Sequence, residues 1–403
     1  MKDGWEIRKL GEVCEVMNGG TPKTGVPENW DGSHLWITPA EMGKRLSPYV
    51  SNTERKLTDF GLRDSSARML PPKSVILSSR APIGYLVINT EPMATNQGCK
   101  GLIPRSQIHY KYLYYYLLSI VDLLNSLGTG ATFKELSGGK LKEVTIPLSA
   151  LSEQLRIVAL LDEAFEGIAT AKANADKNLK NARQLFESYL NSVFSQRGEG
   201  WVEDKLVSLT TKIGSGATPR GGGESYKTEG TALIRSLNIY DLGFKYSKLA
   251  FLDDAQADVL SNVILQSGDV LLNITGASVA RCCTVPGDVL PARVNQHVSI
   301  IRPIANRLDS EFLHYLLISK YYKNQLLQTG AEGGATRQAI TKAQIQDFTV
   351  RYPADIREQK SIVDSLDSIL QQTQRLESIN QKKIEALDAL KKSILKKAFS
   401  GKL

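Results

Sequence analysis

Short apolar runs separated by Gly and Pro fill two long stretches of the chain. The first stretch contains HLWITP, SVILSS, YLVINT, GLIP and EVTIPL, and the second contains ALIRS, DVLLNI, RCCTV, VSIIRP and DFTVRYP. Runs of this length, rich in Val, Ile and aromatic residues and bounded by turn residues, are typical of β-strands. Helical patterns interrupt them at residues 57–63, 112–127, 255–262 and 310–327. Each stretch therefore predicts a small mixed sheet with a few helices.

Two further segments, residues 152–195 and 356–400, have helical periodicity. Neither contains proline, and Gly167 is the only glycine inside them. Alternating steps of four and three residues define one seam in each segment, which is the pattern of a coiled coil. The first seam is Ile157, Leu161, Ala164, Ile168, Ala171, Ala175, Asn178, Ala182, Leu185 and Tyr189. The second is Ile362, Leu366, Ile369, Thr373, Leu376, Asn380, Lys383, Leu387, Leu390 and Ile394.

The two seams differ in side-chain size, since the first is rich in alanine and the second in Leu and Ile. Small residues facing large ones pack well, so we expect the two helices to pair with each other. The alternative is that each helix lies on its own globular part. An antiparallel pair would relate the two globular parts by a pseudo-two-fold axis, and we expect that direction.

The second half of the chain repeats the first. The offset rises from 196, where Trp201 matches Trp5, to 205, where Glu358 matches Glu153. The Thr-Pro pairs at residues 21–22 and 218–219, the Asn-Gln pairs at 96–97 and 295–296, and the Gly-Ala-Thr triplets at 130–132 and 334–336 also match. A period this long is a whole domain rather than a solenoid unit.

We therefore predict an α+β protein with an internal repeat: two similar globular domains and two long helices that form an antiparallel coiled coil. The expected division is residues 1–151 and 200–354 for the globular domains and residues 152–199 and 355–403 for the helical spacers.

Composition places the chain among ordinary globular proteins. It has 403 residues, 42% hydrophobic and 23% charged, with a formal net charge of +8. There is no apolar run of 18 residues and no secretory h-region near the start, so we expect no membrane partner and a cytoplasmic location. The four cysteines form no C-x-x-C pair and the four histidines are isolated, which favours buried reduced thiols and no metal site.

Signatures of catalysis are missing. No Walker A motif, N-P-P-Y or D-P-P-Y tetrapeptide, G-x-S-x-G, H-E-x-x-H or zinc-deaminase pattern occurs. The tetrad DEAF at residues 162–165 resembles a helicase fragment, but it lies on the predicted coiled coil and is interpreted as solvated helix charge. We therefore expect no catalytic residues and no cofactor in this chain.

Candidate nucleic-acid contacts lie in the loops. Tyr110, Tyr112 and Tyr114–Tyr116 could stack on bases, although packing against the sheet is the favoured interpretation. The matched Thr-Pro and Gly-Ala-Thr loops suit phosphate contacts or simply tight turns. The Asn-Gln pairs could bond adenine edges or bridge strands. Loop residues that differ between the copies are the better candidates for base reading. The candidate DNA-binding residues are Thr21, Lys44, Arg45, Arg80, Thr132, Thr218, Arg220, Arg235, Arg281, Thr336 and Arg337.

Lysines also gather at the end of the chain. Residues 380–403 hold seven lysines against Glu385 and Asp388. These lysines are either a solvated face near a helix C-terminus, which the helix dipole favours, or a docking surface for an acidic partner or for DNA backbone. The candidates for docking are Lys391, Lys392, Lys396 and Lys397.

Taken together, four repeated elements resemble the specificity subunits of type I restriction–modification enzymes. They are W-x-x-x-x-L at the start of each copy, G-x-T-P at residues 19–22 and 216–219, the Asn-Gln pair before a strand, and an I-P or Y-P strand that leads into E-Q-x-x-I-V at 153–158 and 358–363. The resemblance spans essentially the whole chain. One departure is the polar interruption of both seams, at Asn178 and at Asn380 and Lys383.

The resemblance implies two target-recognition domains that each read half of a bipartite double-stranded DNA site. It also implies two methylation subunits that use S-adenosylmethionine on adenine N6, and two restriction subunits that use ATP and Mg²⁺, so that these cofactors lie on the partners. The alternative functions are a stand-alone nuclease or DNA-modifying enzyme with a dispersed site, and a two-domain repressor that binds DNA without a partner.

Overall fold

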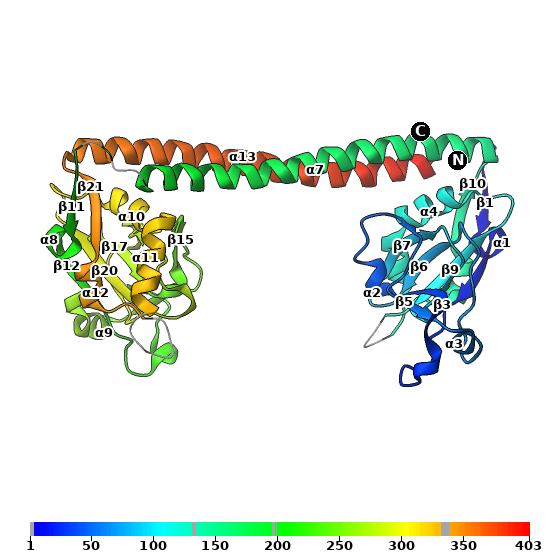
Figure 1. Ribbon diagram of the computed structural model, residues 1–403, viewed down its shortest axis with the longest axis horizontal. Coiled ribbons are helices and arrows are strands. Elements are labelled where there is room, and N and C mark those ends of the chain that lie inside the picture. The colour runs from blue at the N-terminus through cyan, green and yellow to red at the C-terminus, as the bar shows by residue number, and fades with distance from the viewer. Residues whose placement is uncertain (1–3, 131–133, 196–197, 199, 332–338) are drawn as a thin grey trace. The chain divides into compact units, whose positions relative to one another are not determined.

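A computed structural model describes residues 4–130, 134–195, 198, 200–331 and 339–403. Contacts divide the chain into two units (Figure 1). Unit 1 consists of Met1–Asp176 and Lys382–Leu403, and unit 2 of Lys177–Gln381. Each unit thus combines one copy of the globular repeat with parts of both long helices. The four-segment division expected from the sequence stays a prediction.

The first half of the chain begins with a short strand and ends in the first long helix, whose residues from Lys177 onward belong to unit 2. Its elements are β1 (Glu6–Lys9), α1 (Leu10–Val13), β2 (Cys14–Asn18), η1 (Pro27–Asn29), β3 (Trp30–Ile37), α2 (Pro39–Met42), β4 (Tyr49–Val50), β5 (Arg55–Leu57), α3 (Asp59–Arg63), β6 (Val75–Ser79), β7 (Ile83–Asn89), β8 (Met93–Thr95), β9 (Cys99–Pro104), α4 (Tyr110–Ser119), α5 (Val121–Leu127), α6 (Gly138–Glu143), β10 (Thr145–Leu148) and α7 (Leu151–Ser195). The strands form sheets in the orders β2-β9-β6-β7-β4, β5-β3-β8 and β1-β10.

The second half of the chain repeats this order with small insertions. Its elements are β11 (Trp201–Lys205), α8 (Leu206–Leu209), β12 (Thr210–Ser215), η2 (Gly222–Ser225), β13 (Thr231–Ile234), η3 (Ser236–Asn238), β14 (Ile239–Tyr240), β15 (Gly243–Phe244), β16 (Ala250–Leu252), α9 (Asp254–Val259), η4 (Ser261–Val263), β17 (Val270–Asn273), η5 (Gly276–Ser278), β18 (Cys282–Thr284), η6 (Gly287–Val289), β19 (Ala292–Val294), β20 (Val298–Pro303), α10 (Ser310–Ile318), α11 (Lys320–Ala331), α12 (Lys342–Asp347), β21 (Thr349–Pro353) and α13 (Ile356–Phe399). The sheet orders are β12-β20-β17-β18, β16-β13-β19, β14-β15 and β11-β21.

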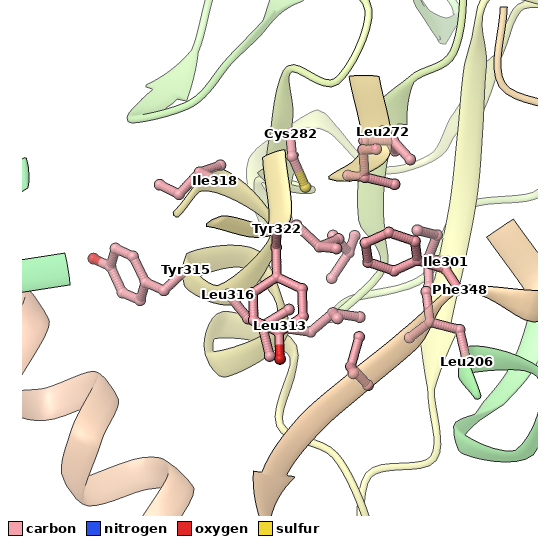
Figure 2. Packing of buried hydrophobic residues seen from close by; sticks show 14 of the residues in the cluster. Leu206, Leu272, Cys282, Ile301, Leu313, Tyr315, Leu316, Ile318, Tyr322 and Phe348 are labelled. Atoms are coloured by element: carbon pink, nitrogen blue, oxygen red, sulfur yellow. The ribbon is translucent and has the colours of Figure 1, made fainter. Parts of the chain in front are cut away.

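The predicted strands and helices are present, and the expected mixed sheet is divided into several small sheets in each unit. In unit 1, α4 packs on the sheet that contains β6 and β7, and in unit 2, α10 packs on the sheet that contains β17 and β18. Each helix lies between its sheet and the long helices (Figure 1). In unit 2 the side chains of α10 meet those of β17, β20 and α8 in a single core (Figure 2). The helical stretches at 112–127 and 310–327 each break in two, at Ile120 and at Ser319.

A buried glutamine joins each globular part to the long helix that follows it. In unit 1 the Gln154 side chain accepts a hydrogen bond from the His109 backbone N–H at 2.9 Å. It donates to the carbonyls of Gln107 and Ser149 at 2.9 and 2.8 Å. Its exposed fraction is 0%. Gln154 therefore ties the first turn of α7 to the loop before α4 and to the segment after β10.

Gln359 makes the same three bonds in unit 2. It accepts from the Asp309 N–H at 2.8 Å and donates to the carbonyls of Arg307 and Pro353 at 2.9 and 2.8 Å. These two glutamines are the Q of the repeated E-Q-x-x-I-V motif. The motif is thus explained by backbone groups at the start of each long helix that take this side chain as their hydrogen-bond partner.

A second repeated contact lies about two turns further along each long helix. The Tyr115 hydroxyl donates to Asp162, and the Tyr315 hydroxyl donates to Asp367. Burial and the carboxylate raise the pKa of both phenols, so they stay protonated donors at neutral pH. Asp162 also accepts from Lys111 at 2.7 Å, and its side chain is 38% exposed, so this member of the tetrad 162–165 is a helix charge that is partly solvated and partly paired.

Within unit 1 the long helices run antiparallel, as predicted. Arg156 near the start of α7 bonds the Leu403 carbonyl, and Lys172 pairs with Asp388 at 2.8 Å, so residue numbers rise along α7 as they fall along α13. In unit 2, Arg183 of α7 lies 3.6 Å from Glu377 of α13.

The predicted seams are correct in part. Ile157, Leu161, Ala175 and Ala182 of α7 are buried, as are Leu366, Thr373 and Asn380 of α13. Asn178 and Lys383 are exposed, and Leu185, Leu376 and Leu390 are 52%, 43% and 47% exposed. The register is wrong there because both helices also pack on the globular parts. From Ala182 onward α7 buries every fourth residue, Phe186, Leu190 and Phe194, in the core of unit 2.

We predict that Gln154→Leu lowers the free energy of unfolding by at least about 1–3 kcal/mol. The substitution keeps the volume but removes the side-chain partner of one backbone N–H and two backbone carbonyls. Gln184→Leu is the matched control, because Gln184 is exposed on the same helix and its loss should cost within about 0.5 kcal/mol. Urea denaturation of the full chain measures both. Equal stabilities of the two variants would contradict the role assigned to Gln154.

Candidate nucleic-acid interface

In each unit, a repeated set of five hydrogen bonds joins the ends of several strands to the turn that contains the Asn-Gln pair. We call this set the Asn frame. In unit 1 it joins the end of β6 at Ser79, the turn Asn96–Gly98 and Leu136. The Asn96 N–H donates to Ile37 O at 2.9 Å, and Asn96 O accepts from the Cys99 N–H at 2.9 Å. The Ser79 N–H donates to Gly98 O at 2.7 Å, and the Leu136 N–H donates to Ser79 O at 2.9 Å. The Asn96 side chain accepts from the Gly98 N–H at 2.8 Å.

Unit 2 contains the same five bonds between Ile234, Ile274, the turn Asn295–His297, Val298 and Ile340. The Asn295 N–H donates to Ile234 O at 3.1 Å, and the Val298 N–H to Asn295 O at 3.3 Å. The Ile274 N–H donates to His297 O at 3.0 Å, and the Ile340 N–H to Ile274 O at 2.8 Å. The Asn295 side chain accepts from the His297 N–H at 3.1 Å. The frame thus aligns the two units residue by residue.

The G-x-T-P loop attaches to this frame through glycine. The Gly19 N–H donates to Cys99 O at 3.2 Å, and the Gly216 N–H donates to Asn295 O at 3.2 Å. A Cβ at Gly19 would lie 2.0 Å from Asn96 O, and one at Gly216 would lie 1.7 Å from Val294 O. Only glycine allows so close an approach of two backbones.

The threonines of this loop also bond within the protein. Thr21 Oγ1 accepts from the Asn96 side-chain amide at 2.8 Å, and the Thr218 hydroxyl pairs with the side chain of Gln296. Of the two interpretations of the Asn-Gln pairs, bridging of strands therefore holds for both asparagines. Gln97 and Gln296 are exposed.

Arg80 follows Ser79 and extends from the frame of unit 1. Its side chain is 36% exposed, and its guanidinium lies 3.9 Å from the Glu135 carboxylate. Lys100, which is buried, lies 3.7 Å from the same carboxylate. The arrangement leaves one net positive charge at the frame, partly open to solvent.

The matching positions of unit 2 carry different chemistry. Thr275 takes the place of Arg80, and its hydroxyl lies 2.6 Å from Nδ1 of His297. Ser299 and Ala339 replace Lys100 and Glu135. Arg281 lies in the adjoining loop, with its guanidinium 4.8 Å from the centre of the Tyr240 ring.

Other predicted DNA-binding residues take no part in the hydrogen bonds of the frame. Arg45 bonds to the buried Glu41 and to the Asn52 carbonyl, and Lys44 pairs with Glu54 at 3.3 Å. Arg235 bonds to the Lys248 carbonyl and lies over the Tyr226 ring. Arg220 is exposed. Thr132, Thr336 and Arg337 lie outside the described residues.

The four lysines proposed for docking differ in environment. Lys391 Nζ lies 4.8 Å from the centre of the Phe165 ring, so Lys391 packs against α7 within unit 1. Lys392, Lys396 and Lys397 are exposed. Lys392 and Lys396 line a groove of about 1200 Å³ whose apolar wall includes Trp5, Tyr116 and Phe399.

The remaining candidates for chemistry are structural. Tyr112, Tyr115 and Tyr116 are buried in the core of unit 1, so the packing interpretation of the tyrosine cluster holds. All four cysteines are free and buried, and burial raises the pKa of Cys14, Cys99 and Cys283 to about 12, which keeps them as unreactive thiols. Within the described ranges, no three metal-ligating side chains form a group, and no helix has the length and apolarity to cross a bilayer.

Sequence reasoning missed Gly98, Lys100 and Glu135 in the first copy and Thr275 and His297 in the second. The signal was available in the repeat for Gly98, Lys100 and His297, which lie next to the matched Asn-Gln pairs and differ between the copies. The candidates chosen from the sequence were mostly Lys and Arg, so they did not include Thr275 and His297, which occupy this site in the second copy.

A family model described as the type I restriction modification DNA specificity domain matches residues 2–180 and 212–386. A specificity subunit of the type I enzyme MjaIX from Methanocaldococcus jannaschii is 30% identical over 66% of this chain and 61% of its own length. The specificity subunit of EcoR124I/EcoR124II from Escherichia coli is 29% identical over 47% of this chain and 48% of its own. The chain thus spans less than two thirds of these two relatives.

Solved structures show the same fold. One is a chain from a study of complex assembly and conformational transition in a type I restriction–modification system, with a TM-score of 0.78, 21% identity, and coverage of 100% of this chain and 99% of that one. Another is the HsdS subunit from Thermoanaerobacter tengcongensis, with a TM-score of 0.63, 21% identity, and coverage of 100% and 98%.

We predict that Asn96→Ala lowers the free energy of unfolding by about 1–3 kcal/mol, because the buried Gly98 N–H loses its acceptor. The neighbouring variant Gln97→Ala is the control and should change stability by no more than about 0.5 kcal/mol, since that side chain is exposed. Chemical denaturation followed by tryptophan fluorescence measures both. A loss in Gln97→Ala as large as in Asn96→Ala would argue against the frame.

Proposed function

Because the chain belongs to the family of type I restriction–modification DNA specificity proteins, we propose that it reads an asymmetric, bipartite DNA site for a complex whose catalytic subunits are separate chains. The observation that carries this proposal is the Asn frame. Two matching sets of five hydrogen bonds present different side chains, Arg80 in one copy and Thr275 with His297 in the other. A duplicated scaffold with different exposed chemistry suits two readers of two different half-sites.

In this proposal the chemistry belongs to the partners. Two methylation subunits would supply S-adenosylmethionine and methylate adenine N6, and two restriction subunits would use ATP and Mg²⁺ to translocate and cut, in the cytoplasm. The long helices α7 and α13 would set the number of base pairs between the half-sites, at about one turn of DNA.

The exposed lysines Lys392, Lys396 and Lys397 are proposed as a docking surface for an acidic face of a methylation subunit or for DNA backbone. Lys392 and Lys396 border the apolar groove of unit 1, so a partner there would meet both charge and apolar surface. By the repeat offset of 205, the matching positions on α7 are Glu187, Asn191 and Ser192. The three lysines therefore occur on the helix of the second copy and are not repeated on the helix of the first.

We predict that the chain, mixed with its methylation subunit, gives adenine methylation at one bipartite motif. Exchange of residues 1–150 with those of a relative should change one half of that motif and leave the other half intact. Sequencing of methylated adenines reads both halves at once. A simultaneous change of both halves would contradict the two-reader model. Metal-stimulated cleavage by the isolated chain would favour the stand-alone enzyme instead, and tight operator binding without partners would favour the repressor.

For the docking surface, we predict the effect of replacing Lys392, Lys396 and Lys397 together by Gln. If the surface binds the methylation subunit, assembly weakens several-fold. If it binds DNA backbone, the slope of log affinity against log salt falls by the equivalent of up to about three phosphate contacts. The motif itself should not change. Lys177, Lys180 and Lys360, exposed on the same two helices, provide the control triple variant. If assembly and salt slope both match those of the control, the lysines are only a solvated helix end.

A further inference from the structure

We propose that residues 80 and 98 of unit 1, and residues 275 and 297 of unit 2, form the equivalent base-reading position of the two copies, and that Arg80 selects a guanine in its half-site. The inference rests on the proposed function and adds to it the residues and the base. It starts from the Asn frame, because the five shared hydrogen bonds fix the backbone of both positions in the same way.

Side chains at the two positions complement each other in size. In unit 1, a Cβ at Gly98 would lie 3.0 Å from Arg80 Nε and 3.1 Å from Arg80 Cγ. The arginine therefore crosses the space that a side chain at 98 would need. In unit 2 the small residue is Thr275 and the large one is His297, and the two side chains lie 2.6 Å apart. Each pair therefore fills one site. In unit 1 the long side chain comes from the first position, Arg80, and in unit 2 it comes from the second, His297.

The surroundings of Arg80 suit a ligand with two acceptors. Its side chain is partly exposed, and its one ion pair with a described residue, Glu135, is long at 3.9 Å and shared with Lys100. Guanidinium groups bond to both O6 and N7 of guanine in the major groove, which is a common base-specific contact. Glu135 holds the guanidinium by charge without using its donors in short hydrogen bonds.

Unit 2 offers a single ring nitrogen instead. Nδ1 of His297 faces Thr275, which leaves Nε2 as the atom free to meet a base. One nitrogen cannot reproduce the two parallel bonds of a guanidinium. The two half-sites should therefore differ in base preference at this equivalent position, even though the supporting backbone is the same.

The test is a reciprocal exchange in the full chain assembled with its methylation subunits. The double variant Arg80→Thr/Gly98→His should lose preference for guanine at one position of the first half-site, by about 5- to 140-fold. The exchange Thr275→Arg/His297→Gly should introduce guanine preference at the equivalent position of the second half-site. Methylation of a library with randomised half-sites, read by sequencing, measures every position together.

Two single variants keep the result interpretable. Arg80→Lys retains charge and fold but lacks the planar pair of donors, so it should weaken the guanine preference while overall methylation persists. Arg8→Thr, an exposed arginine on β1 outside the frame, should leave the motif unchanged.

An unaltered motif in both double variants would overturn the assignment while the wild-type motif still upheld the proposed function. Equal weakening on all four bases would also overturn it, because Arg80 would then be a phosphate contact. Absence of any bipartite motif in the wild-type complex would instead refute the proposed function itself.

Discussion

Two buried glutamines, Gln154 and Gln359, connect the globular parts of this protein to its long helices. Each satisfies one backbone N–H and two carbonyls at the point where a strand ends and a helix begins. Such groups are costly to bury without partners, so the side chain fixes where the helix leaves the domain. The tyrosine–aspartate bonds of Tyr115 and Tyr315 lie further along the same helices and oppose rotation about that point. A recognition surface can be aimed only if its attachment is rigid.

The Asn frame plays the corresponding role at the loop end of each unit. It is built from main-chain groups and one asparagine, and close approach of the G-x-T-P loop through Gly19 or Gly216 completes it. The side chains with distinct chemistry extend from this support, whereas its bonds use main-chain groups and the asparagine. In this way one backbone arrangement can present a guanidinium in one copy and a hydroxyl–imidazole pair in the other.

Repeat, strands and helix pairing were predictable from the sequence, because hydrophobic periodicity reports directly on which face is buried. The exact seam was not. Leu376 and Leu390 fit a coiled-coil pattern yet are exposed, since the helices also contact the globular parts and turn a different face inward. The role of Gln154 was hidden for another reason: its partners are backbone groups, which leave no residue pattern. Arg45 carried a usable signal in Glu41, four residues before it, whereas His297 became visible only when both copies were aligned on the same bonds.

Separation of support from chemistry has a consequence for how such a protein changes over generations. Exchange of the side chains at Arg80 or Thr275 removes none of the five hydrogen bonds of the frame and none of the glutamine bonds, so such variants should keep the fold. Each copy can also vary alone, because its frame is complete within its own unit. If the proposed function holds, mutation can change the side chains of one copy at a time, while the stability of the fold constrains the hydrogen bonds of the frame.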